Sequence, residues 1–96
     1  MKLEELRIYN PATEIGERIW GFTKELSYYN KTTLGIQLIK AADSIAANIS
    51  EGFGRYHYKD ARNFYYYSRG SIFETKTWLK KCTAGIYFLK PNIPIL

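Results

Sequence analysis

Apolar residues recur at helical spacing in the first segment of the chain, over residues 11–29. They follow one another every three or four positions: Ile15, Ile19, Phe22, Leu26 and Tyr29. This spacing places them on one face of an α-helix. Asn10 and Pro11 stand at its start, where Asn caps exposed N–H groups and Pro suits the first turn. We therefore predict an amphipathic helix over residues 11–29.

The next segment, residues 33–53, carries a second stripe of the same kind. Its members are Leu34, Leu38, Ala42, Ile45 and Ile49. Several alanines lie beside the stripe, and small residues let a neighbouring helix approach closely. We expect this helix at the centre of a bundle, with Leu38, Ile45 and Ile49 buried. Two glycines within three residues, Gly52 and Gly54, end it.

A third helix is predicted over residues 58–85. Its stripe contains Ala61, Tyr65, Ser68, Ile72, Thr75, Leu79, Cys82 and Ile86. We expect Ile72 to be buried together with the core of the second helix. Pro91 and Pro94 forbid a regular helix near the end of the sequence, so residues 86–96 are predicted to form an irregular tail.

These three patterns predict an all-α fold, an up-and-down antiparallel helical bundle that forms a single domain over residues 1–96. Hydrophobic residues make up 46% of the chain, which excludes an intrinsically disordered protein. No stretch approaches the roughly 20 apolar residues that span a bilayer, so we expect no membrane partner. The N-terminal residues resemble no signal peptide, and Cys82 is the only cysteine, which favours a reducing, cytoplasmic setting.

The positive charge gathers in the last third of the chain. Residues 61–96 contain six Lys or Arg and one acidic residue, out of a net charge of +5 for the whole sequence. An excess of this kind indicates an acidic partner, most commonly nucleic acid. The alternative is a solvated helix face that only aids solubility.

The residue types that enzymes need are scarce. His57 and Cys82 are the only members of their types and lie on different segments, so no metal site is predicted. Residues 52–55, Gly-Phe-Gly-Arg, follow no strand and lack the Lys-Ser/Thr of a phosphate-binding loop. We therefore predict no catalytic residues, no cofactor and no enzymatic activity.

Two groups of polar residues are candidates for a binding site. Asn48, Glu51 and Arg55 fall on one helical face, and Arg69 and Glu74 come from the next helix. One interpretation is a polar site for a ligand or RNA. The other is a buried polar network of Asn48, Glu51, Arg69 and Glu74 that fixes helix register or a subunit interface.

Cations and aromatic residues alternate along the third helix at intervals of three and four. This basic aromatic stripe comprises Arg62, Tyr66, Arg69, Phe73, Lys76 and Lys80, and four further tyrosines lie nearby in sequence, Tyr56, Tyr58, Tyr65 and Tyr67. Single-stranded nucleic acid requires such a mixture, because cations track phosphates and rings stack on bases. Tyr and Arg are equally favoured at protein interfaces, so a subunit contact is the alternative.

Two segments of the chain carry a resemblance to a known family. Residues 44–55 read SIAANISEGFGR, and residues 68–72 read SRGSI with Glu74 two positions on. In these motifs the chain resembles the four-helix-bundle proteins known as 23S rRNA-intervening-sequence proteins, over roughly residues 12–83. That family is similar in fold to the accessory protein of diversity-generating retroelements, which works with a reverse transcriptase and RNA. The resemblance implies a ring-like homopentamer, with RNA or a reverse-transcriptase-like protein as partner.

The chain departs from the family pattern in three places. Ala46 replaces a usual proline, which predicts a less kinked second helix, and His57 replaces a helix-capping serine. The family's fourth helix, expected after position 89, is missing from this sequence. An apolar groove would then need another cover, so we expect a homo-oligomer. The function expected is a non-catalytic, self-assembling adaptor that binds RNA or an RNA-handling protein. The alternative is a purely structural homo-oligomer.

Overall fold

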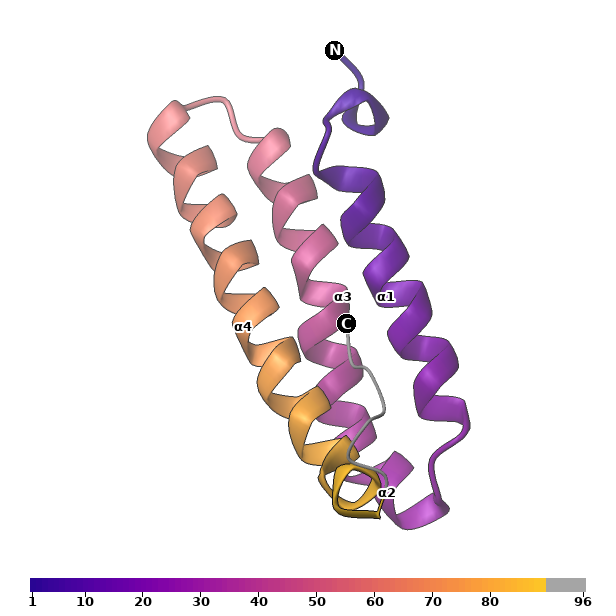
Figure 1. Ribbon diagram of the computed structural model, residues 1–96. Helices are drawn as coiled ribbons and strands as arrows, with labels where there is room; N and C mark the ends of the chain where they lie inside the picture. Colours follow the sequence, from indigo (N-terminus) through magenta and orange to yellow (C-terminus); the bar gives the residue numbers. More distant parts are fainter. Residues whose placement is uncertain (90–96) are drawn as a thin grey trace.

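The fold is entirely helical in the part of the chain that the structure describes. The computed structural model describes the backbone of residues 1–89 and the side chains of residues 1–83. Its elements are a 3-10 turn η1 (Leu3–Glu5) and the helices α1 (Tyr9–Lys24), α2 (Tyr28–Thr32), α3 (Leu34–Phe53) and α4 (Tyr58–Leu89). The three long helices alternate in direction (Figure 1). The predicted all-α, up-and-down bundle is therefore confirmed.

Helix α3 lies between α1 and α4 and forms the core with both (Figure 1). Leu38, Ile45 and Ile49 are buried, as predicted from the second stripe. Within the described residues, α1 and α4 both pack on α3 but scarcely contact each other. The three long helices therefore form a layer with α3 at its centre, rather than a closed three-helix bundle in which each helix contacts the other two.

Small side chains bring α3 and α4 close together. A Cβ atom on Gly52 would lie 2.8 Å from the Tyr65 ring and 3.0 Å from the Ala61 carbonyl oxygen. Further along α4, the buried Ser68 Oγ donates a hydrogen bond to the Ile45 carbonyl oxygen at 2.8 Å. A larger residue at either position would force the helices apart, so these two sites set their separation.

The buried face of α4 carries three further hydroxyl groups. Ser71, Thr75 and Thr83 donate to carbonyl oxygens one turn earlier in α4, at 3.1, 2.7 and 2.9 Å. No buried side-chain nitrogen or oxygen in the described part of the chain lacks a partner. The hydroxyl groups therefore enter the core without an unpaired polar atom, which would destabilise the fold.

The predicted helix over residues 11–29 is two helices, α1 and α2. Helix α1 begins earlier, at Tyr9, because Asn10 donates to the Glu4 carbonyl oxygen instead of capping. It ends at Lys24, and Ser27 then caps α2 by accepting a hydrogen bond from the Asn30 N–H at 3.3 Å. The stripe alone did not reveal this break, because Ser27 stands between its last two members.

The other helix bounds agree more closely with the sequence. Helix α3 begins at Leu34, one residue later than predicted, and ends at Phe53 with Gly54 as its C-cap. Helix α4 begins at Tyr58 as predicted but continues to Leu89, so residues 86–89 of the predicted tail are helical. A single glycine such as Gly85 costs only about 1 kcal/mol inside a helix and did not end it. Residues 90–96 of the predicted tail lie outside the described residues.

The prediction that Ile72 is buried was wrong. Its side chain is 36% exposed, and the neighbouring Ser71 faces the core instead. The reason is the layer arrangement: Ile72 lies on the side of α4 that faces α1 across the groove, where α1 does not reach it.

Helices α1 and α3 meet at Gly16 and Asp43. A Cβ atom on Gly16 would lie 2.8 Å from Asp43 Oδ1, so the aspartate packs against the backbone of α1. Partial burial there raises the pKa of the Asp43 carboxyl group, and the nearby Glu17 carboxylate raises it further. Ionised Asp43 therefore opposes the packing of α1 on α3.

Two glycines provide a test of the α3–α4 packing. Gly52→Ala should lower the free energy of unfolding by about 1–3 kcal/mol, because the new methyl group meets the Ala61 carbonyl and the Tyr65 ring. Gly70→Ala is the matched control, since nothing lies within 4 Å of its Cβ position and alanine favours a helix by about 1 kcal/mol. Urea unfolding of both variants measures the difference. Equal effects of the two substitutions would contradict the close approach at Gly52.

The raised pKa of Asp43 gives a pH dependence of stability. A raised carboxyl pKa means that the folded state holds the proton more tightly than the unfolded state. The contribution of Asp43 to stability should therefore increase as the pH falls from neutral through its folded pKa, and level off below its unfolded pKa. Asp43→Asn should raise the unfolding temperature at pH 7 and flatten this dependence.

Asp60→Asn is the control for that substitution. Asp60 lies exposed in the first turn of α4, where a negative charge is favourable, so its replacement should not stabilise the protein. Thermal unfolding from pH 3 to 8, followed by circular dichroism, compares the variants. A lower unfolding temperature for Asp43→Asn at pH 7 would show that its charge stabilises the interface instead.

Candidate nucleic-acid interface

All six residues of the basic aromatic stripe lie exposed on α4. Their intervals of four and three residues keep them on one flank of the helix over about five turns. The two rings of the stripe, Tyr66 and Phe73, expose 58% and 57% of their surface. The stripe runs beside the face that packs on α3, so both its cations and its rings face solvent.

Phe73 lies between two cations of the stripe. The Arg69 guanidinium carbon is 5.8 Å from the centre of the ring, and the Lys76 ammonium is 5.6 Å from it. Both distances lie within the range of a cation–π interaction. The Phe73 ring is therefore exposed for stacking with a base. The cations on either side of it can contact the flanking phosphates.

The cations of the stripe have no acidic partner among the described residues. The ion pairs found there join Glu14 to Arg18 at 2.8 Å and Glu51 to Arg55 at 3.1 Å. Arg62, Arg69, Lys76 and Lys80 take part in neither pair. Their charges are therefore not neutralised by carboxylates of the same described surface.

Arg55 lies apart from the stripe. Its guanidinium stacks on the Phe64 ring at 4.5 Å and pairs with Glu51. Phe64 is two residues from Tyr66, which corresponds to about 200° around the helix axis. Arg55 therefore belongs to the opposite flank of α4, and the structure does not bring it together with the other five cationic and aromatic candidates.

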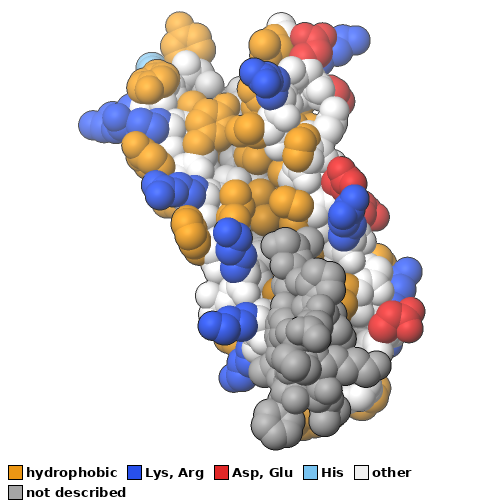
Figure 2. Space-filling model, viewed as in Figure 1, with side chains coloured by type: hydrophobic (Ala, Val, Ile, Leu, Met, Phe, Trp, Pro, Cys, Tyr) orange, Lys and Arg blue, Asp and Glu red, His pale blue; other side chains and the backbone are white. Residues whose placement is uncertain are grey.

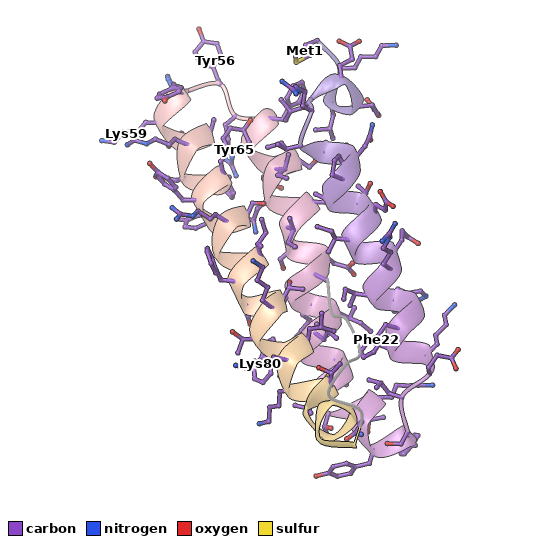
Figure 3. All side chains as sticks on the ribbon, in the orientation of Figure 1. Met1, Phe22, Tyr56, Lys59, Tyr65 and Lys80 are labelled. Carbon is purple, nitrogen blue, oxygen red and sulfur yellow. The ribbon has the colours of Figure 1, made fainter. Side chains whose placement is uncertain are left out.

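The nearby tyrosines also divide between different surfaces. Tyr56 and Tyr58, in the turn before α4 and at its start, are 95% and 80% exposed. Tyr65 instead points towards α3 and packs on Ile45 and Ile49 (Figure 3). Tyr67 makes an edge-to-face contact with Phe64, with ring centres 5.5 Å apart. Only some of these tyrosines are thus free to contact a partner.

Among the described residues, no hydrogen bond or ion pair connects the four members of the predicted polar network to one another. Asn48 donates to the Ser44 carbonyl oxygen, and Glu51 pairs with Arg55, both within α3 or its end. Glu74 accepts a hydrogen bond from Trp78 Nε1 at 3.2 Å, within α4. The buried bond between α3 and α4 comes from Ser68 instead. A role for these residues in a ligand site or a subunit interface stays a prediction.

His57 directly precedes α4, and Cys82 lies about two turns before its last residue, Leu89. They are 25 residues apart, which is about 37 Å along a helix. His57 contacts the Tyr56 ring edge-to-face at 5.0 Å, and Cys82 packs against the core formed by Ile19, Leu38 and Leu79. Burial raises the pKa of the Cys82 thiol, which makes it a weaker nucleophile. Among the described residues, no group of three or more His, Cys, Asp or Glu stands close enough to hold a metal ion.

The sequence predicted an apolar groove but not the residues of its walls, and the structure has a hollow between α1 and α4. Its lining includes Ile8 from the residue before α1, Ile15 from α1 and Ile72 from α4. Ile8 stands seven residues before Ile15 and so extends the apolar flank of α1 that carries the first stripe, which was a signal in the sequence. Periodicity cannot show whether such a flank is covered, because this depends on how α1 and α4 are placed around α3.

The comparisons with known proteins identify the family. The sequence model described as 23S rRNA-intervening sequence protein matches residues 4–92, a longer range than the two motifs alone indicated. No curated protein and no solved structure matches the chain. None of the helices, within the residues described, combines the length and apolar character needed to cross a bilayer. Because the family match extends over nearly the whole sequence, and the helices have the arrangement expected from the motifs, the chain belongs to the 23S rRNA-intervening sequence protein family.

Proposed function

We propose that this protein is a non-catalytic, self-assembling helical adaptor that binds single-stranded RNA through the basic aromatic stripe of α4. The observation that carries the proposal is the exposed Phe73 ring between Arg69 and Lys76. Charge without rings would favour any polyanion, whereas rings between cations favour unstacked bases along a phosphate backbone. An RNA-handling protein, such as a reverse-transcriptase-like partner, is the alternative occupant of the same surface.

The non-catalytic part of the proposal is supported by the separation of His57 and Cys82 along α4. The self-assembling part is supported by large apolar side chains that lie exposed, such as Trp20 at 49% and Ile36 at 46%. Surfaces of this kind are typical of contacts between proteins. The single cysteine is in keeping with a reducing, cytoplasmic setting.

Salt dependence of binding tests the RNA proposal. Replacing Arg62, Arg69, Lys76 and Lys80 by Gln should weaken binding to a single-stranded RNA and reduce the slope of log K against log salt, by about 0.7 for each lost phosphate contact. Fluorescence anisotropy with a labelled oligonucleotide measures both quantities.

A matched variant controls for net charge. Lys2, Lys24, Lys31 and Lys40 are exposed and lie outside α4, so replacing them by Gln removes the same charge from other elements. This control should change the slope much less. Equal slopes for the two variants, or a slope unaltered by the stripe substitutions, would contradict RNA binding at the stripe.

The second candidate function is a purely structural homo-oligomer, which the exposed apolar residues favour on their own. Self-assembly predicts that the midpoint of unfolding rises with protein concentration, because association stabilises only the folded chains. Thermal unfolding over a hundredfold range of concentration, with sedimentation velocity at each end, measures this. A folded monomer at micromolar concentration would overturn self-assembly. An oligomer without any RNA affinity would favour the structural function.

A further inference from the structure

A groove runs between α1 and α4, with α3 as its floor. Ile45 and Ile49 of α3 form the floor, and Ile8 and Ile72 stand on opposite sides. The hollow has a volume of about 330 Å³. Figure 2 shows hydrophobic side chains gathered between α1 and α4 in the upper half of the view.

The charges at this groove are of one sign. Arg7 and Arg69 are the charged residues of its lining, and no carboxylate belongs to that lining. Glu14 and Arg18 lie on the neighbouring part of α1, beside Pro11 and Ile15, and form an ion pair with each other. Figure 2 shows Lys and Arg side chains along the α4 side of the groove, whereas the α1 side carries both signs. An occupant of matching chemistry is therefore apolar on one face and acidic at its edges.

We infer that this groove binds an acidic amphipathic α-helix of a partner protein. The partner's apolar face would lie on Ile45 and Ile49, and its flanking carboxylates would reach Arg7 and Arg69. Ile8 and Ile15 are seven residues apart on one wall, as are Tyr65 and Ile72 on the other. Each wall is thus about 10 Å long, or two helical turns, which matches apolar anchors at positions i, i+3 or i+4, and i+7.

Other occupants fit the charge pattern less well. Residues 90–96 of this chain include one lysine and no aspartate or glutamate, so they offer the two arginines no side-chain carboxylate. RNA phosphates would suit the arginines, but the isoleucine floor offers bases no ring to stack on. The groove inference therefore goes beyond the RNA function proposed for the stripe.

Two peptides of about 15 residues, long enough to form a helix when capped, serve as probes. Both carry leucine at positions i, i+3, i+4 and i+7 of one face. One has glutamate at the flanking positions and the other has lysine. Fluorescence anisotropy with the full chain should show the glutamate peptide binding at least about tenfold more tightly than the lysine peptide.

Substitutions outside the RNA stripe locate the site. Ile72→Gln and Arg7→Glu should each weaken the binding of the glutamate peptide by about tenfold. Ile36→Gln and Lys81→Glu are matched controls, because these residues are exposed but do not line the groove, and they should have little effect. Circular dichroism checks that each variant is folded. Because none of these residues belongs to the stripe, the RNA affinity should persist, so failure of one proposal is distinguishable from failure of the other.

Three results would overturn the inference. The first is equal binding of the two peptides, and the second is binding that neither Ile72→Gln nor Arg7→Glu weakens. The third is that the glutamate peptide does not bind. In that case, sedimentation of Ile72→Gln shows whether the substitution dissociates an oligomer. A dissociated oligomer would assign the groove to a second copy of the chain, and an intact one would leave the groove with no helical partner.

Discussion

The close approach of α3 to α4 is the constraint on which the remaining structure depends. Gly52 leaves room for the Tyr65 ring, and the buried Ser68 hydroxyl donates to the Ile45 carbonyl oxygen. These contacts hold two long helices side by side as one antiparallel unit. Helix α1 then packs on the other side of α3 only, so the groove, its floor and its two walls all follow from the position of α3.

The same constraint explains how α4 divides its residues. Its inner face carries small hydroxyl residues, Ser68, Ser71 and Thr75, because larger side chains would separate the helices. Among the large side chains of this part of α4, Tyr65 packs against Gly52 of α3, whereas Tyr66 and Phe73 lie exposed on the flank. Tight packing on one face and a broad exposed surface on another are thus two results of one sequence pattern.

Helical periodicity predicted the long helices and most of the core correctly, because burial on one face imposes the intervals of three and four that the sequence displays. It failed at Ser27, where a local side-chain cap interrupted a stripe that continued across the break. It failed again at Ile72, because exposure there depends on the distance between α1 and α4, which no local pattern contains. The basic aromatic stripe of α4 was predictable residue by residue, because all its members lie on one helix. The predicted polar network joins residues of α3 and α4, and the sequence did not specify how these two helices are placed relative to each other.

The one-sided attachment of α1 has a consequence for how binding and local stability are linked. Helix α1 can detach without breaking the contacts between α3 and α4, so its local unfolding is a smaller event than unfolding of the whole chain. Detachment would remove one wall of the groove at the same time. A ligand bound between the two walls would therefore also stabilise the attachment of α1 to α3. Occupancy of the groove would make local unfolding of the N-terminal third of the protein less frequent.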